Sequence, residues 1–189
     1  MKHLLSLHDL RKVNLQNTKV TWRGIAEIAA RLTQVTSLAV GGEGTDPAEL
    51  GVLSGMAQLE ELDLGGVKTT DEEILHLRSL RSLRTLRLSD WCGDKGLEAL
   101  RTLSNMETLV LYDSHVTDGG LSSLESMKRL TSLDLRWSSA ITDAGIGAIG
   151  RCKSLRSLRL TGTGVSPAGV ARLRKLLPGC QIEYVEKKA

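Results

Sequence analysis

The sequence lacks several features that would indicate other classes of protein. Its 189 residues contain no phenylalanine, and only 3% of them are aromatic. No apolar run approaches the roughly 20 residues that a membrane-spanning helix needs. The net charge of +3 is too small to favour a nucleic acid as partner. We therefore expect neither a membrane nor a nucleic acid as the partner of this chain.

Cysteine and histidine are also scarce, and neither forms a metal motif. The three cysteines are an odd number without a CxxC pair, and the four histidines have no metal-ligand spacing. Cys92 and Cys152 occupy positions at which other segments carry valine, isoleucine, leucine or methionine, so we expect both to be small core residues. Free thiols of this kind indicate a reducing compartment, cytoplasmic or otherwise intracellular. We expect no metal and no cofactor.

The sequence also gives little indication of catalysis. Asp113, Ser114 and His115 bring together the residue types of a hydrolase triad. Neighbours in one loop rarely reach triad geometry, however, because that geometry depends on the roles of residues in space. We therefore expect no catalytic residues and a protein that is not an enzyme.

What the sequence does contain is a repeat. Two apolar residues separated by a single residue recur at intervals of 25, 24, 24, 23, 24, 25 and 24 residues. The pairs are Val13/Leu15, Leu38/Val40, Leu62/Leu64, Leu86/Leu88, Leu109/Leu111, Leu133/Leu135, Leu158/Leu160 and Ile182/Tyr184. Such alternation is typical of a strand with one buried face, and the constant period indicates a solenoid.

Each pair is followed by the signals of a short helix. In the fifth unit, Thr117 and Asp118 form a helix start, because a threonine side chain can accept from free backbone N–H groups and aspartate favours the first turn. Leu121, Leu124 and Met127 follow at three-residue spacing and form one apolar stripe. The predicted unit is a strand, a loop and a short helix, which must pack on its neighbours to bury its apolar side.

The LxxLxL spacing of the pairs resembles that of the leucine-rich-repeat family. The phrases VTDGGL and ITDAGI, with CKSLRSLRL after the second, are similar to its ribonuclease-inhibitor-like and F-box-associated cysteine-containing subtypes. The resemblance covers nearly the whole chain and implies an α/β fold: a right-handed solenoid of about seven repeats plus a terminal strand. Parallel crossovers are nearly always right-handed, and helices need more lateral room than strands. We therefore expect a concave parallel sheet with short helices on its convex side.

The repeats predict a single domain over residues 1–189. Residues 1–9 form a partial repeat or an N-terminal cap, residues 10–178 form seven repeats, and residues 179–189 form a terminal strand and a charged tail. The first segment has no clear polar cap. Either the chain is cut from a longer protein, or a short opening helix covers the first strand.

The residue between the two apolar positions of each strand is expected to point into the concave side. On this basis Asp63 faces Arg87 on the next strand, and Asp134 faces Arg159. Two interpretations remain open. The residues are exposed cross-strand pairs of small energetic value, or they recognise a charged partner.

Charge also changes along the axis of the predicted solenoid. Residues 40–74 contain nine acidic residues and one basic residue, whereas residues 151–175 contain seven basic residues and no acidic residue. This asymmetry either steers and orients a partner or is ordinary solvated surface.

The few aromatic residues indicate a candidate binding site. Trp91, Tyr112 and Trp137 follow strand ends in three consecutive units, and therefore on one edge of the predicted sheet. Arg136 and Arg159 are expected beside them. Exposed tryptophan, tyrosine and arginine together are typical of interface hot spots. We predict that these five residues bind a partner protein, with Tyr112, Arg136 and Trp137 as the anchors.

The aromatic residues also have a purely structural interpretation. Trp91 could fold inward to fill the space left by its shorter, 23-residue unit, and Trp137 could cover the extra residue of its own unit. If the rings are exposed instead, Asp90 and Asp113 complete a polar surround. Exposure is the prediction for Tyr112 and Trp137, and both interpretations remain open for Trp91.

These observations favour a non-catalytic module that binds a partner protein through its concave face and its strand-end loops. One alternative is a structural subunit of a large assembly. Another is the substrate-recognition part of a ubiquitin ligase, which the resemblance to the F-box-associated subtype suggests. The sequence contains no F-box-like helical segment, so that role would require a further segment.

Overall fold

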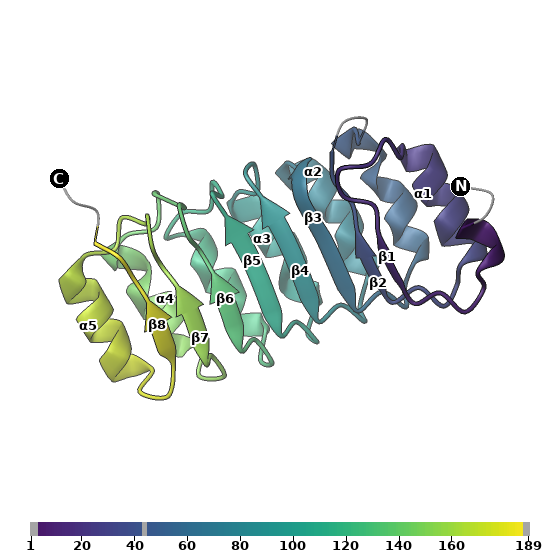
Figure 1. Cartoon of the computed structure of the whole chain (residues 1–189). Coiled ribbons are helices and arrows are strands. Elements are labelled where there is room, and N and C mark those ends of the chain that lie inside the picture. Colours follow the sequence, from purple (N-terminus) through teal and green to yellow (C-terminus); the bar gives the residue numbers. More distant parts are fainter. Residues whose placement is uncertain (1–3, 43–44, 187–189) are drawn as a thin grey trace.

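The computed structural model describes residues 4–42 and 45–186. Residues 1–3 of the expected cap, residues 43–44 of the second unit and residues 187–189 of the expected tail lie outside this description. The strands of the described part form one eight-stranded parallel sheet in sequence order (Figure 1). They are β1 (Lys12–Asn14), β2 (Ser37–Ala39), β3 (Glu61–Lys68), β4 (Thr85–Ser89), β5 (Thr108–Tyr112), β6 (Ser132–Asp134), β7 (Ser157–Arg159) and β8 (Gln181–Glu183).

Short helices return the chain from each strand to the next, and they all lie on one side of the sheet (Figure 1). The α-helices are α1 (Trp22–Arg31), α2 (Asp71–Ile74), α3 (Asp94–Ala99), α4 (Ile146–Arg151) and α5 (Pro167–Leu176). The 3-10 helices are η1 (Leu4–Ser6), η2 (Pro47–Gly55), η3 (Leu75–Ser79), η4 (Leu100–Thr102), η5 (Gly120–Ser126) and η6 (Asp143–Gly145). None of the helices in residues 4–42 and 45–186 is long and apolar enough to cross a membrane.

The predicted register of the sheet is confirmed. The first apolar residue of each pair is the Cα partner of the first apolar residue of the next pair, for example Leu109 and Leu133, from β1 through β8. Both members of each pair are buried from β2 to β7. At the two ends Leu15, Ile182 and Tyr184 are only partly buried, because no further unit covers them in the described structure.

The helix of the fifth unit begins later than the sequence predicts. Thr117 and Asp118 precede the helix, which is η5 and starts after Gly119. The three-residue spacing of Leu121, Leu124 and Met127 is the period of a 3-10 helix, in which residues three apart lie on one face. All three side chains are buried. The stripe was therefore predicted correctly. Thr117 also accepts a backbone hydrogen bond as expected, from Gly119 N–H at 3.2 Å, but the helix begins only at Gly120.

Asp118 instead bonds the next unit. Its carboxylate accepts from the backbone N–H and the hydroxyl of Thr142, at 2.8 and 2.6 Å. Asp94 accepts from the N–H and the hydroxyl of Thr117 in the same way, at 2.8 and 2.7 Å. Asp143 accepts from both groups of Ser166. An aspartate ladder therefore connects consecutive units along the starts of the helices.

A glycine in each following unit makes room for this ladder. A Cβ atom at Gly120 would lie 2.2 Å from Asp94 Oδ1, and one at Gly145 would lie 2.5 Å from Asp118 Oδ1. The phrases VTDGGL and ITDAGI thus have a physical explanation. The aspartate accepts hydrogen bonds from the next unit, and the glycine, which has no side chain, leaves room for the aspartate of the preceding unit.

A left-handed residue follows the paired apolar positions in each of the seven units; in the third unit it lies within β3. This residue lies four positions after the first apolar residue of the pair and has positive φ: Asn17, Gly42, Gly66, Asp90, Asp113, Trp137 and Gly162. Glycine, asparagine and aspartate tolerate this conformation, whereas a bulky side chain rarely adopts it. Trp137, with φ of 67°, is the exception among these residues.

Candidate functional site

The three rings predicted to form the binding site are exposed at the carboxyl ends of neighbouring strands. Tyr112 is the last residue of β5, and Trp91 and Trp137 lie in the turns after β4 and β6. Their exposed fractions are 39% for Tyr112, 47% for Trp91 and 51% for Trp137. The inward position considered for Trp91 is therefore not observed. We call Trp91, Tyr112 and Trp137 the aromatic rim.

Trp91 packs against two residues that the sequence did not indicate. Its ring centroid lies 5.5 Å from that of His115, with an angle of 54° between the planes. Lys68 Nζ lies 6.0 Å from the Trp91 ring centroid. Lys68 reaches this place because β3 continues past Gly65 and Gly66, and its register with β4 shifts between Asp63 and Lys68, so that Lys68 pairs with Ser89. That irregular extension departs from the repeat, and so the period could not predict it.

Arg136 lies between the aromatic rim and the concave face. Its guanidinium carbon is 5.6 Å from the Tyr112 ring centroid, a cation–π distance. Its Nε donates to both Asp134 oxygens, at 2.9 and 3.0 Å, and its Nη2 donates to Oδ2 at 2.7 Å. The predicted anchor is therefore held in place by a carboxylate of its own strand segment.

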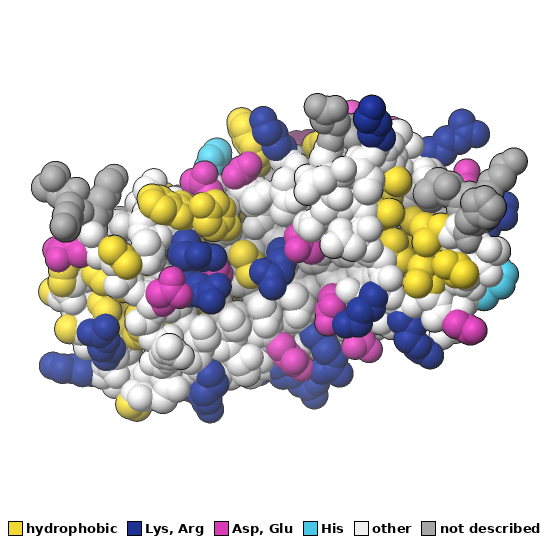
Figure 2. All heavy atoms as spheres, viewed as in Figure 1, with side chains coloured by type: hydrophobic (Ala, Val, Ile, Leu, Met, Phe, Trp, Pro, Cys, Tyr) yellow, Lys and Arg dark blue, Asp and Glu magenta, His cyan; other side chains and the backbone are white. Residues whose placement is uncertain are grey.

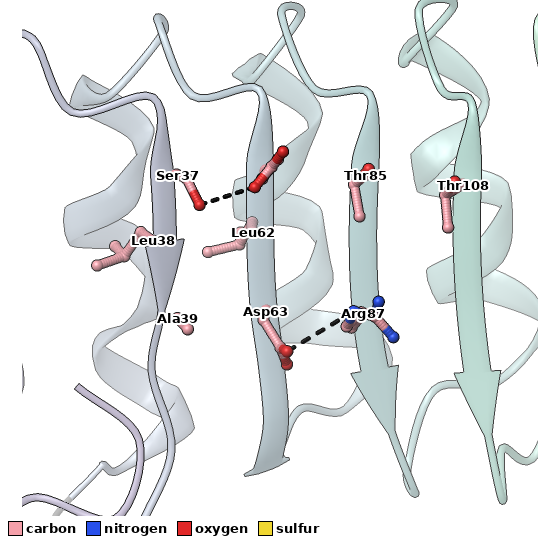
Figure 3. Close-up of a pocket in the computed structure, with 9 residues that line it drawn as sticks. Ser37, Leu38, Ala39, Leu62, Asp63, Thr85, Arg87 and Thr108 are labelled. Atoms are coloured by element: carbon pink, nitrogen blue, oxygen red, sulfur yellow. Dashed lines mark hydrogen bonds and ion pairs between the residues drawn. The ribbon is translucent and has the colours of Figure 1, made fainter. Parts of the chain in front are cut away.

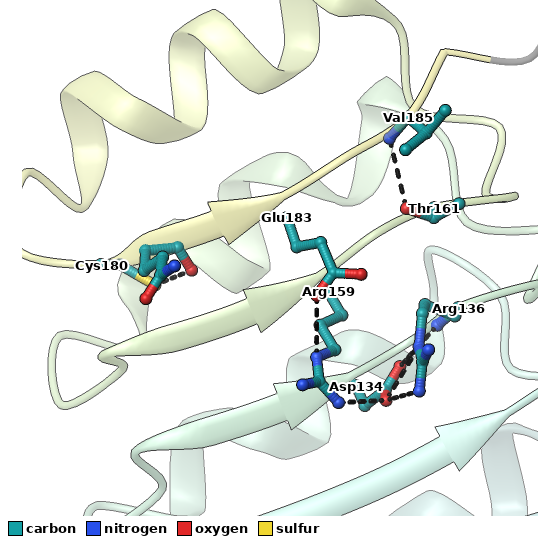
Figure 4. A network of polar contacts seen from close by, with 8 residues as sticks. Asp134, Arg136, Arg159, Thr161, Cys180, Glu183 and Val185 are labelled. Carbon is teal, nitrogen blue, oxygen red and sulfur yellow. Dashed lines mark hydrogen bonds and ion pairs between the residues drawn. The ribbon is translucent and has the colours of Figure 1, made fainter.

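Asp134 is the buried centre of this network (Figure 4). Its side chain is only 5% exposed, so the pair with Arg159 is not the fully exposed cross-strand pair considered from the sequence. Burial opposes its ionisation, but the side-chain and backbone hydrogen bonds of Arg136, followed by the charge of Arg136, outweigh burial and lower the pKa of Asp134. The hydrogen bond to Asp134 likewise raises the pKa of Arg136.

Arg159 lies between two carboxylates. Its Nη1 is 3.5 Å from Asp134 Oδ2, and its Nε is 3.0 Å from Glu183 Oε2 (Figure 4). The two predicted arginines thus share one buried aspartate, and both guanidinium groups have carboxylate partners within the sheet.

Trp137 lies against the next unit. A Cβ atom at Gly162 would be 2.6 Å from Trp137 Cε3, so only glycine leaves room for the ring there. The face of the molecule in Figure 2 shows exposed hydrophobic side chains directly beside Lys and Arg side chains over the C-terminal half of the sheet. The structure therefore brings Tyr112 and Arg136 together and joins Arg136 to Arg159 through Asp134, whereas Trp91 has a separate surrounding of its own.

A shallow hollow of about 320 Å³ lies on the concave face over β2 to β5 (Figure 3). Small and polar side chains form most of its lining, with Asp63 and Arg87 across it. The predicted Asp63–Arg87 pair is present, with 3.7 Å between Asp63 Oδ2 and Arg87 Nε. Beside it, the hydroxyl of Ser37 donates to Glu61 at 2.9 Å. The charged groups of the hollow therefore have partners within the protein.

The cysteines are free thiols in the core or at its edge. Cys92 and Cys152 are buried, and Cys180 is partly buried. Burial, with the nearby charges of Asp71 and Asp94, raises the pKa of Cys92 to about 12. Within the described residues, no cluster of three or more His, Cys, Asp or Glu residues could hold a metal ion.

Family models of leucine-rich repeats match two parts of this chain. A family model for Zer-1-like leucine-rich repeats matches residues 74–144, and a second leucine-rich-repeat model matches residues 151–173. No match was found among curated proteins.

Solved structures with the same fold include two internalins from Listeria monocytogenes. Internalin InlF has a TM-score of 0.77 and 20% identity, over 98% of this chain and 50% of the internalin. Internalin C2 has a TM-score of 0.72 and 21% identity, over 96% of this chain and 74% of that one. A leucine-rich-repeat protein from Leptospira interrogans has a TM-score of 0.51 and 20% identity, over 97% and 57% of the two chains.

The chain spans half the length of internalin InlF. At these identities the likeness concerns the fold alone. The matched repeat models, the eight parallel strands and the similar solved structures together lead to one conclusion. The chain has the leucine-rich-repeat solenoid fold, and residues 74–144 and 151–173 match leucine-rich-repeat family models.

Proposed function

We propose that this chain is a non-catalytic module that binds a partner protein through the aromatic rim and the adjoining concave face, including Arg136 and Arg159. Leucine-rich-repeat solenoids in general present extended concave surfaces to other proteins. Eight strands spaced about 4.8 Å apart form a sheet roughly 34 Å long, which suits a protein segment better than a small molecule.

One observation carries the proposal most strongly. Trp137 has a left-handed backbone conformation at a position where the other six units have glycine, asparagine or aspartate. This conformation costs a bulky residue about 1–2 kcal/mol. The ring is nevertheless half exposed, so burial within the chain returns only part of that cost. Contact with a partner would bury the exposed half of the ring and offset the rest of that cost.

The proposal also includes the domain bounds, the repeat subtype and the location of the protein. Residues 1–189 form a single domain, with the repeats in residues 10–178. The TDxG phrases, which the aspartate ladder explains, support the ribonuclease-inhibitor-like or F-box-associated subtype. Free Cys92 and Cys152 support an intracellular, reducing location.

The test is a measurement of affinity with rim variants. The tagged chain captures partners from its native cells under reducing conditions, and the affinity for the purified partner is measured by calorimetry. Tyr112→Ala and Trp137→Asn should each weaken binding by about 30-fold, which corresponds to about 2 kcal/mol at 25 °C. Leu75→Ala is the matched control, because Leu75 is also exposed, at 46%, but begins η3 on the helical side.

The control should bind as tightly as the wild type. Unchanged affinity in both rim variants would overturn the proposal. The acidic second and third units would then be the next region to test.

A further inference from the structure

The cations of the concave face are balanced by carboxylates of the same face. Asp134 and Glu183 contact Arg159, and Asp134 also binds Arg136. Arg87 faces Asp63 across the hollow. Within the described part of the chain, each of these arginines therefore has a carboxylate nearby, and the face gives little reason to expect an acidic partner.

The aromatic rim differs, because the carboxylates of the residues next to it in the sequence are not balanced by cations in this way. Asp90 and Asp113 occupy the left-handed turn in consecutive units, directly beside Trp91 and Tyr112 in the sequence. Asp113 is exposed and Asp90 is partly exposed. Within residues 4–42 and 45–186, neither side chain has an ion pair or a hydrogen bond. Lys68 is the nearby cation, and it lies against the Trp91 ring.

Two of the three rings of the rim already lie near cations of the chain itself. Tyr112 lies at a cation–π distance from Arg136, and Trp91 lies beside Lys68. The face of an aromatic ring attracts a cation through its quadrupole, and an adjacent carboxylate adds charge to that attraction. Exposed rings and unpaired carboxylates on neighbouring residues therefore supply the chemistry of a site for lysine or arginine.

The charges at the two ends of the solenoid favour the same partner. Residues 45–74, next to the Trp91 end of the rim, contain eight acidic residues and one basic residue. At the opposite end α5 exposes Arg172, Arg174 and Lys175. A basic segment would be attracted to the first region and repelled by the second, which fixes where it lies along the sheet.

We propose that the Trp91–Tyr112 end of the aromatic rim binds a lysine or arginine side chain from a basic segment of the partner protein, with Asp90 and Asp113 as the acceptors. This inference rests on the proposed function and specifies the chemistry of the partner. The rings contact the aliphatic stem and the cationic head, and the two carboxylates pair with the charge.

The inference is tested first by titrating the protein with octa-arginine or octa-glutamate peptide at low salt. Binding is measured by the change in fluorescence of the exposed tryptophans. The wild type should bind octa-arginine and not octa-glutamate. The double variant Asp90→Asn/Asp113→Asn should weaken octa-arginine binding by about 10-fold. The matched control is Glu27→Gln/Glu98→Gln, which removes the same charge from exposed positions on α1 and α3. It should change the affinity by less than about 2-fold, because it alters only the long-range field of the protein.

Two results would overturn the inference: equal affinity of the two double variants for octa-arginine, or preferred binding of octa-glutamate. The same variants are then measured with the captured partner protein. If Tyr112→Ala and Trp137→Asn weaken that complex but Asp90→Asn/Asp113→Asn does not, the proposed function stands and the basic partner is wrong. If the ring variants have no effect, the proposed function itself fails.

Discussion

The carboxylate of Asp94 accepts hydrogen bonds from both the backbone N–H and the hydroxyl of Thr117, one unit further along the solenoid. A single side chain therefore satisfies two donors at the start of the next helical segment. Because Thr117 Oγ1 also accepts from Gly119 N–H, the bonds continue from one unit into the turn of the following one. The ladder supplements the apolar contacts that connect the units.

The ladder predicts opposite effects at two adjacent glycines. Gly120→Ala should destabilise the protein by about 1–3 kcal/mol, because its Cβ would collide with Asp94. Gly119→Ala should be neutral or slightly stabilising, because its Cβ would meet only ordinary contacts at 3.5 Å or more and its φ of −64° suits alanine. Urea unfolding measures both. Combining Gly120→Ala with Asp94→Ala should cost less than the sum of the two changes. Equal stability of the two alanine variants would contradict the packing described for Gly120.

Leu133 tests the repeat register. It is 1% exposed and pairs with Leu109 on the neighbouring strand. Leu133→Asp would bury an unpaired charge and should cost several kcal/mol, with the loss spreading beyond its own unit. Leu75→Asp changes the same residue type at an exposed position and should have little effect. Wild-type thermal stability in Leu133→Asp would mean that the assigned register is wrong.

Acid should weaken the protein through Asp134. Because folding lowers the pKa of this carboxyl group, its stabilising effect is present above the ordinary aspartate pKa of about 3.9. The effect is lost as the pH falls through the lower pKa of the folded state. The free energy of unfolding, measured in urea between pH 6 and the acid limit, should therefore decrease in this range. Asp134→Asn should reduce the slope, and an unchanged slope would contradict the assignment.

The backbone of Trp137 gives a prediction about stability that is separate from binding. Trp137→Asn loses the contact of the ring with Gly162 but removes the left-handed strain, so its free energy of unfolding should stay within about 1 kcal/mol of the wild type. Trp91 has a similarly exposed ring, but its backbone φ is not positive. Trp91→Asn therefore loses ring contacts without relieving strain, and it should be the less stable variant. Chemical denaturation compares the two. A larger loss in Trp137→Asn would mean that the tryptophan serves the fold itself.

The sheet could be predicted from the sequence in detail because one pattern fixes many positions. The constant period and the alternation of Leu109 with Leu111 determine both the face and the register of each strand, since a slip by one residue would expose every apolar side chain. The type of helix was harder to predict. A three-residue apolar stripe fits a 3-10 helix and one face of an α-helix, so the stripe of η5 does not distinguish them.

The candidate site was predictable only in part. The exposure predicted for Tyr112 and Trp137 is observed, because residues at strand ends leave the repeat core. The burial of Asp134 was not predicted. It depends on Arg136 folding back over its own strand, which the repeat pattern does not encode. The position of Lys68 was missed for a similar reason, since β3 leaves the repeat geometry at this point.

The most direct test of the aromatic rim as the binding site places a photoreactive amino acid at single positions in the chain. Benzoylphenylalanine at Tyr112 probes the rim, and at Leu75 it probes the helical side with similar exposure. Each variant is irradiated with the purified partner, and the crosslinked product is quantified by mass spectrometry. We predict efficient crosslinking from position 112 and little from position 75. Crosslinking from position 75 with none from position 112 would contradict the account.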